Sequence, residues 1–269
     1  MYRLTHANFS RLWKTQAFGL FIAAMLVLSS GFMVMQATAM DYTVPLSRVI
    51  FLPLSFYGVT AAAFVSVFTG ADFSDGFVRS KLLAAENRRD FVFSHILVSC
   101  AACILVYVIS SLFTLCTGIF FFENNVEINV FIKYFMIGIG MSAAYGCIFC
   151  VITLLCKNRI NAVIWCMGIA FFMLFLSLHT HQLLVQTEYK NGVLNPHYID
   201  GFRRILYGLL HDLNPCGQAA QLSAWEVWNP IRASVCNFIW IVSTAVAGCW
   251  LFNNKILNNK RYLWNICCS

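Results

Sequence analysis

Charged residues are scarce in this sequence. Asp, Glu, Lys and Arg make up 11% of its 269 residues, against about 25% in a typical soluble domain, and 60% of the residues are hydrophobic. A soluble chain of this composition could not cover its surface with polar groups. Lipid is therefore the expected solvent, and the chain is predicted to be an integral membrane protein.

The common catalytic, nucleotide-binding and metal-binding motifs are absent from the sequence as well. The sequence has no GxxxxGK[ST] loop for nucleotide phosphates, no GxSxG nucleophile elbow, no HExxH metal site and no GxGxxG dinucleotide loop. Although the formal net charge is +7, no basic run of five residues occurs and no basic stripe alternates with aromatic residues. We therefore expect no catalytic residue, no metal or other cofactor, and no nucleic-acid partner.

Twelve cysteines are present, but most of them lie inside apolar runs, where a free cysteine packs as a small hydrophobe. The spacings Cys100–Cys103 and Cys147–Cys150 have no nearby His or carboxylate to complete a tetrahedral metal site. Cys216 is the cysteine expected outside the apolar runs. His179 and His181 are two residues apart, so on a helix they point in nearly opposite directions and cannot share a metal.

Six apolar stretches are long enough to cross a bilayer, whose hydrocarbon core of about 30 Å needs about 20 helical residues. They cover residues 17–36, 49–70, 91–122, 130–155, 162–184 and 231–252. Ala37-Thr38-Ala39 resembles a signal-peptide cleavage site, but the first stretch is longer than a signal h-region, so an uncleaved helix is expected. The prediction is an all-α integral membrane protein with six transmembrane helices in a single transmembrane domain, 1–269.

The distribution of Lys and Arg predicts the orientation of the spans. With the N-terminus inside, 12 of the 18 basic residues lie on the cytoplasmic side and 6 on the other side, three of these in one long loop. The positive-inside rule therefore predicts an N-in/C-in topology. No Asp, Glu, Lys or Arg lies at the middle of a predicted span, so any energy for transport is expected to enter from outside the bilayer.

The N-terminal stretch is predicted to form an interfacial elbow helix along the inner leaflet. Leu4, Phe9, Leu12 and Trp13 lie near one face of such a helix, with Arg and Lys opposite. A frayed tail is the alternative.

The cytoplasmic loop 71–90 is short and carries four acidic and four basic residues. Val78, Leu82 and Ala85 form a narrow apolar stripe at helical spacing, which predicts a short amphipathic helix suited to docking onto another protein. A solvated turn is the alternative.

The external segment 185–229 is too long for a simple connection between spans. An amphipathic helix is predicted in it, with the apolar face Phe202, Ile205, Leu206, Leu209, Leu210 and Leu213. This helix is expected to stop at Leu213-Asn214-Pro215-Cys216-Gly217, and a second short helix is expected from Gln218 to Trp225.

The segment 72–97, which reads DFSDGFVRSKLLAAENRRDFVFSHIL, resembles the first cytoplasmic loop and following helix of type-2 ABC exporter permeases of Gram-positive bacteria. The Ser-Asp-Gly sequence at 74–76 is its most distinctive part. The six-span layout, the basic N-terminal elbow, the Leu-Asn-Pro-x-Gly-Gln stretch at 213–218 and the ending at 251–255 are similar too.

The resemblance implies a permease subunit without an ATPase site of its own. Two copies of a separate ABC ATPase, which bind ATP and Mg, would dock beneath a pair of permeases that are identical or sister chains. The coupling helix at the ATPase contact would comprise Asp75, Gly76, Phe77, Arg79, Lys81 and Leu82. Phe9, Leu12 and Trp13 would belong to the elbow helix, the external helices would form a re-entrant element, and the chain would lie in the bacterial plasma membrane.

The function implied by this resemblance is ATP-driven export of an amphipathic or hydrophobic molecule, such as an antimicrobial peptide or a lipid. Two alternatives stay open at this point. The chain could be a non-transporting sensor or partner subunit that binds a peptide at its external helix. It could also be a cofactor-bearing membrane redox protein that uses the cysteines and histidines.

Overall fold

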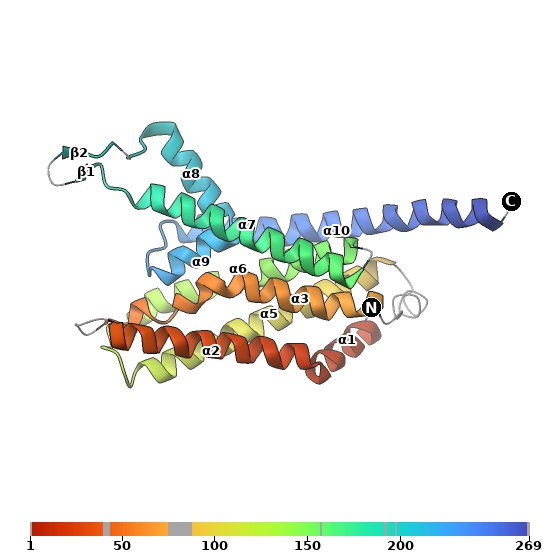
Figure 1. The fold of residues 1–269 in the computed structure, drawn as a ribbon, viewed down its shortest axis with the longest axis horizontal. Helices are drawn as coiled ribbons and strands as arrows, with labels where there is room; N and C mark the ends of the chain where they lie inside the picture. Colours follow the sequence, from red (N-terminus) through yellow and green to blue (C-terminus); the bar gives the residue numbers. More distant parts are fainter. Residues whose placement is uncertain are drawn as a thin grey trace.

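Long helices lie side by side in a bundle and make up nearly all of the structure (Figure 1). The computed structural model describes residues 2–39, 44–74, 88–156, 158–190, 193–196 and 198–267. The helices are α1 (Tyr2–Lys14), α2 (Gln16–Ala39), α3 (Tyr57–Ser74), α5 (Arg88–Gly118), α6 (Ile128–Leu155), α7 (Arg159–Val185), α8 (Gly201–Leu213), α9 (Pro215–Ser223) and α10 (Pro230–Cys267). Two 3-10 turns precede α3, η1 (Leu46–Arg48) and η2 (Leu52–Phe56), and two short strands, β1 (Tyr189–Lys190) and β2 (Val193–Leu194), pair antiparallel.

Six helical segments are long and apolar enough to cross a membrane, as predicted. They are Gln16–Ala39, Leu46–Asp72, Arg89–Gly118, Ile128–Leu155, Arg159–Val185 and Pro230–Leu251. This set of helices is that of a multi-pass membrane protein, because a helix of about 20 apolar residues can cross a bilayer with its backbone hydrogen bonds satisfied within the helix.

The spans differ in how deeply they are buried. In the most apolar parts of α6 and of the second span, 72% and 67% of the residues are buried, whereas the values are 17% for α10 and 22% for α7. α6 contacts α3, α5 and α10, and α2 packs against α3 and α5. The exposed faces of the peripheral spans carry large apolar side chains such as Val27, Phe172 and Phe238, which suit contact with lipid.

The second span is not one continuous α-helix, which differs from the prediction for 49–70. Its first part consists of the turns η1 and η2, and the α-helix begins only at Tyr57. Pro53 lies near the start of η2. Its ring removes a backbone N–H and disfavours helical geometry in the residue before it, so the helix starts after the proline.

The 3-10 turns are covered by other parts of the chain. Phe51 is fully buried and stacks on Trp225, which follows α9, at 5.8 Å between ring centroids. η2 contacts α9, α2 and α3. Leu46 N–H donates to the Glu123 carbonyl at 2.9 Å, so the loop before α6 also satisfies this irregular backbone.

Two glycines let the inner helices approach one another closely. A Cβ on Gly146 of α6 would lie 2.8 Å from the Cα of Cys100 in α5. A Cβ on Gly138 would lie 2.2 Å from the hydroxyl oxygen of Tyr107, which is buried and donates to the Phe135 carbonyl at 3.2 Å. The contact between α5 and α6 therefore depends on small residues in α6.

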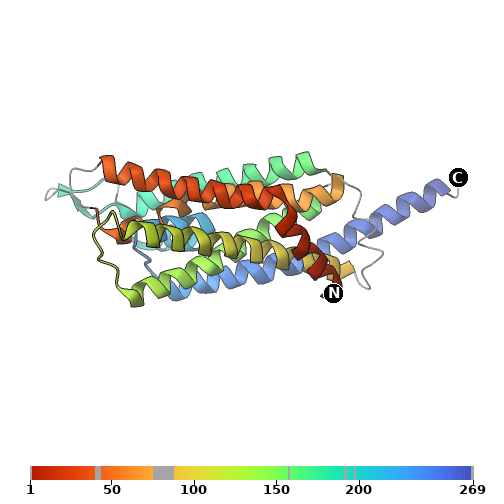
Figure 2. The same cartoon turned by 90° about the horizontal axis from the view of Figure 1, so that it is seen from below.

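The bundle has two different ends. α1 turns away from α2 at Thr15 and lies at the end from which α10 projects beyond the bundle (Figure 2). α8, α9 and the β-hairpin lie at the opposite end (Figure 1). These are called the α1 end and the α8 end below.

Candidate functional site

Two buried carboxylates mark two polar clusters, one at each end of the bundle. Asp72 belongs to the last turn of α3 and has 1% of its surface exposed, and Asp212 of α8 is fully buried. Burial of a charge in an apolar protein is costly unless partners neutralise and hydrogen-bond it. The partners of each carboxylate come from other helices.

The Asp72 cluster joins α1, α3 and α5. Arg11 of α1 forms an ion pair with Asp72, and its Nη2 donates to the Phe68 carbonyl at 2.5 Å. The same guanidinium carbon lies 4.6 Å from the Phe68 ring centroid. His95 of α5 places its Nε2 3.2 Å from the other carboxylate oxygen of Asp72. One turn along α1, the Asn8 amide donates to the Ser94 hydroxyl at 2.8 Å.

The elbow residues predicted from the sequence occur in α1, but they do not share one surface. Leu12 is fully buried in the bundle, Phe9 is half-buried, and Trp13 is 62% exposed. The Trp13 ring lies 5.5 Å from Phe18 of α2 at an interplanar angle of 83°. α1 therefore packs against the bundle through Leu12 and leaves the indole at the surface.

The coupling-helix residues predicted from the resemblance lie outside the described residues. They are Asp75, Gly76, Phe77, Arg79, Lys81 and Leu82. The described helices on either side, α3 and α5, place the two ends of this segment at the α1 end, next to the Asp72 cluster.

The Asp212 cluster joins α8, α9 and α10. Arg232 of α10 pairs with one carboxylate oxygen of Asp212, and the Gln221 amide donates to the other at 2.6 Å. The Gln218 amide donates to the Asp212 carbonyl at 2.7 Å, and Trp228 N–H donates to the Gln221 side-chain oxygen at 3.2 Å. Each helix of this end is thus fixed to the other two through one carboxylate.

The amphipathic helix predicted at 202–213 is present as α8, and the polar residues of its last turn point into the protein, whereas Arg203 in its first turn is exposed. Gly208, His211 and Asp212 are its buried residues. The apolar residues are outside: Phe202 is 77% exposed and Ile205 60%, with Leu206, Leu209 and Leu213 at 53%, 46% and 40%, and Leu210 is half-buried. An apolar surface of this extent marks contact with a membrane or with another chain.

His211 lies between two aromatic partners at the α8 end. Its Nε2 is 3.2 Å from Nδ1 of His181 in α7, and its ring centroid is 5.2 Å from that of Trp228. Burial, and the nearby His181, lower the pKa of His211 to about 4 from the ordinary value of 6.5. His211 is therefore neutral at physiological pH.

The joint between α8 and α9 takes a single residue. Asn214 caps α9 by accepting from Cys216 N–H at 3.1 Å, and Pro215 is the first residue of that helix. The prediction that α9 begins at Gln218 is therefore wrong by three residues, because proline is compatible with the first helical turn. A Cβ on Gly217 would lie 2.0 Å from the His211 carbonyl oxygen, so the two helices meet at this glycine.

Cys216 is buried, which corrects the expectation that it lies outside. The hydroxyl of Tyr145 in α6 donates to its sulfur at 2.8 Å, and burial raises the pKa of this thiol to about 11. The thiol thus stays protonated and unreactive at neutral pH. Within the part of the chain that the structure describes, no three His, Cys, Asp or Glu side chains are arranged to hold a metal ion.

No family model and no curated protein matches this sequence.

Sequence reasoning missed both polar clusters. The sequence places Asp72 in the charged loop 71–90, and it does not show that His95 or Arg232 lies beside a carboxylate. One signal is present for Asp212 and His211: both lie in the last turn of the amphipathic helix, beside its predicted apolar face. For Asp72 and His95, the pairing depends on how α3 and α5 pack, and spacing along the chain does not show it.

Replacement of Arg11 by Ala should remove the cation that α1 supplies to the buried carboxylate of Asp72. We expect a loss of roughly 3–5 kcal/mol in the free energy of unfolding in detergent micelles, since breaking a buried pair strands a charge. The double variant Arg11→Met with Asp72→Leu should recover a large part of this loss. Lys14→Ala is the control, because Lys14 is exposed on the same helix and its removal should cost about 0.5 kcal/mol or less. Equal losses for Arg11→Ala and Lys14→Ala would contradict the role of the pair.

Acid should weaken the α8 end through His211. As the pH falls from 6.5 towards 4, the unfolded state binds a proton that the buried folded imidazole does not, so stability present above pH 6.5 is lost. The slope contributed by this one group is roughly 1.4 kcal/mol per pH unit at most. Between pH 7 and pH 4.5, the free energy of unfolding should change less steeply with pH for His211→Gln than for wild type. The exposed His179→Gln should keep the wild-type slope, and a His211→Gln slope equal to it would refute the assignment.

Proposed function

We propose that the chain is the permease subunit of an ATP-driven exporter of the type-2 ABC class. In this proposal the α1 end faces the cytoplasm, α1 is the elbow helix, and the segment 75–87 contacts a separate ATPase. α8 and α9 form the external element between the last two spans. A second permease, identical or a sister chain, completes the path through the bacterial plasma membrane.

The observation that carries the proposal is the Asp72 cluster. Asp72 lies three residues before Asp75, the first residue of the proposed ATPase contact, and its partners Arg11 and His95 belong to α1 and α5. A push on the segment 75–87 would act at the end of α3 and at the start of α5. Because the cluster ties these two helices to α1, all three would move as one body, which is what a two-state transporter driven by a partner requires.

The distribution of buried charge also supports an external energy source. Within the described spans Asp72 is the buried carboxylate, and it lies at a helix end rather than at mid-membrane. It already has a basic partner. Carriers driven by an ion gradient instead expose ionisable groups near the middle of the bilayer.

The surface around α8 favours an amphipathic or hydrophobic substrate. A groove of about 370 Å³ lies between α7, α8 and α10 and is lined by Ile169, Phe172, Met173, Leu176, Leu210, Leu213, Asn214 and Trp240. It continues into the exposed apolar face of α8. A small polar solute would find few partners on this surface, whereas a peptide or lipid with an apolar part would bury that part.

The proposal is tested by affinity purification of the full chain from native membranes in mild detergent, followed by mass spectrometry. An ABC ATPase should be retained by wild type and lost with the combined charge reversal Asp75→Arg and Arg79→Glu, because these residues would sit at the contact.

The matched control for this purification is Lys133→Glu, an exposed charge reversal at the start of α6 on the opposite end, which should retain the ATPase. Absence of any ATPase from the wild-type sample would overturn the proposal. Retention by the charge reversal would overturn the assignment of the contact.

A further inference from the structure

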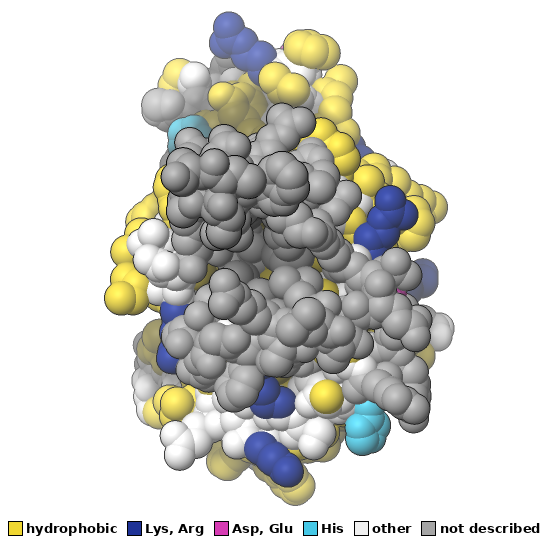
Figure 3. Space-filling view, turned by 90° about the vertical axis from the view of Figure 1, so that its right-hand side faces the viewer, with side chains coloured by type: hydrophobic (Ala, Val, Ile, Leu, Met, Phe, Trp, Pro, Cys, Tyr) yellow, Lys and Arg dark blue, Asp and Glu magenta, His cyan; other side chains and the backbone are white. Residues whose placement is uncertain are grey.

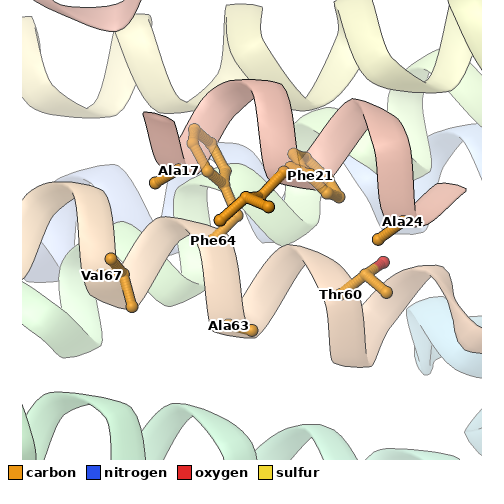
Figure 4. Close-up of a pocket in the computed structure, with 8 residues that line it drawn as sticks. Ala17, Phe21, Ala24, Thr60, Ala63, Phe64 and Val67 are labelled. Carbon is orange, nitrogen blue, oxygen red and sulfur yellow. The ribbon is translucent and has the colours of Figure 1, made fainter. Parts of the chain in front are cut away.

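An apolar groove runs between α2 and α3 in the half of the bundle nearer the α1 end (Figure 4). Its volume is about 280 Å³. It is lined by Ala17, Leu20, Phe21 and Ala24 from α2, and by Thr60, Ala63, Phe64 and Val67 from α3. The three alanines leave the space open, and the one polar side chain, Thr60, donates its hydroxyl to the Tyr57 carbonyl at 2.9 Å. The groove therefore offers its occupant an apolar surface.

The groove begins at the membrane boundary and stays within one leaflet. Ala17 is the second residue of α2, and Ala24 lies seven residues further, which is about 10 Å along a helix. The exposed indole of Trp13 marks the boundary, since tryptophan prefers the level of the lipid headgroups. Half of a hydrocarbon core is about 15 Å thick, so the groove spans most of one leaflet along the membrane normal.

Positive charge is found at the end of the groove nearer the α1 end. Lys14 is exposed and precedes Ala17 by three residues. On α3, Ala63 and Val67 lead to Gly70 on the next turn, where a Cβ would lie 3.2 Å from Cγ of Arg159. Within the described chain, neither Lys14 nor Arg159 pairs with a carboxylate. Other Lys and Arg side chains lie around the described surface of this end (Figure 3).

The lining and the position of the groove favour a lipid chain as the occupant. The lining is apolar apart from Thr60, and the exposed side chain of Leu20 shows that the groove opens to the outside of the bundle. A single acyl chain is slender and wholly apolar, and in a bilayer it arrives already attached to a phosphate at the depth of Lys14 and Trp13.

We propose that the groove between α2 and α3 binds one acyl chain of an anionic phospholipid, whose phosphate is attracted by the positive charge of Lys14 and Arg159 at this end of the bundle. This site is independent of the proposed transport function, since it requires only that the protein lies in a membrane. The bound acyl chain would fill the space between α2 and α3.

The test uses the purified full chain with phosphatidylglycerol or phosphatidylcholine that carry identical acyl chains, and native mass spectrometry to count bound lipids. Wild type should retain phosphatidylglycerol at a concentration several-fold lower than phosphatidylcholine, since each Lys or Arg near an anionic headgroup adds to the affinity. Ala63→Trp fills the groove and should weaken binding of both lipids on the order of tenfold. The control Ala23→Trp adds the same side chain at an exposed position of α2 that does not line the groove, and should bind as wild type does.

A second variant separates the headgroup contact from the groove. Lys14→Glu with Arg159→Glu alters exposed side chains without changing the lining, and should abolish the preference for phosphatidylglycerol while phosphatidylcholine still binds. Equal binding of both lipids by wild type would overturn the proposal, as would unchanged retention by Ala63→Trp. If Ala63→Trp does not elute as a folded protein, the charge reversal decides alone. The wild-type protein could instead form a dimer and show no preference between the two lipids. If Ala63→Trp then blocks the dimer, the groove binds a second copy of the protein, and the proposal is overturned.

Discussion

The structure depends on how its buried charges are neutralised. An ionised carboxylate that is buried away from water must contact a cation and hydrogen-bond donors, and here other helices supply them. Asp72 and Asp212 meet this requirement with Arg11 and Arg232, each supplied by a different helix. The apolar side chains of the spans pack against one another without strong direction, because lipid is as apolar as they are. The two carboxylates therefore determine where the helices outside the main bundle, α1 and α8, attach.

α8 illustrates how this constraint changes the meaning of amphipathicity. On a soluble protein the apolar face of a surface helix packs on the core. Here Asp212 and His211 face inward, and Phe202 and Ile205 face outward. Both faces are satisfied only if the surroundings of the protein are apolar or another chain is present. The orientation of α8 thus agrees with the apolar surroundings that the composition indicates, and it also fits contact with a second chain.

Hydrophobic run length was sufficient to find the six spans, because about 20 apolar residues leave few alternatives to a helix across a bilayer. Helical spacing also located α8, since Phe202 to Leu210 repeat along one face. Helical spacing does not show whether that face points towards the protein or away from it, because it shows which residues share a face and not what they contact. The same limit applied to Asp72 and His95, whose contact arises only when α3 and α5 pack. Pro53 is visible in the sequence, and the late start of the α-helix in the second span follows from its missing N–H.

The 3-10 turns before α3 have a consequence for the way the protein is made. An α-helix can enter a bilayer alone, but backbone without helical hydrogen bonds must be shielded from lipid by other protein. Phe51 and the turn η2 receive that shield from Trp225 and α9, which are synthesised more than a hundred residues later. The second span therefore cannot reach its final form during its own translation. It must wait in an open arrangement, protected by the translocation machinery or by neighbouring spans, until the last quarter of the chain arrives.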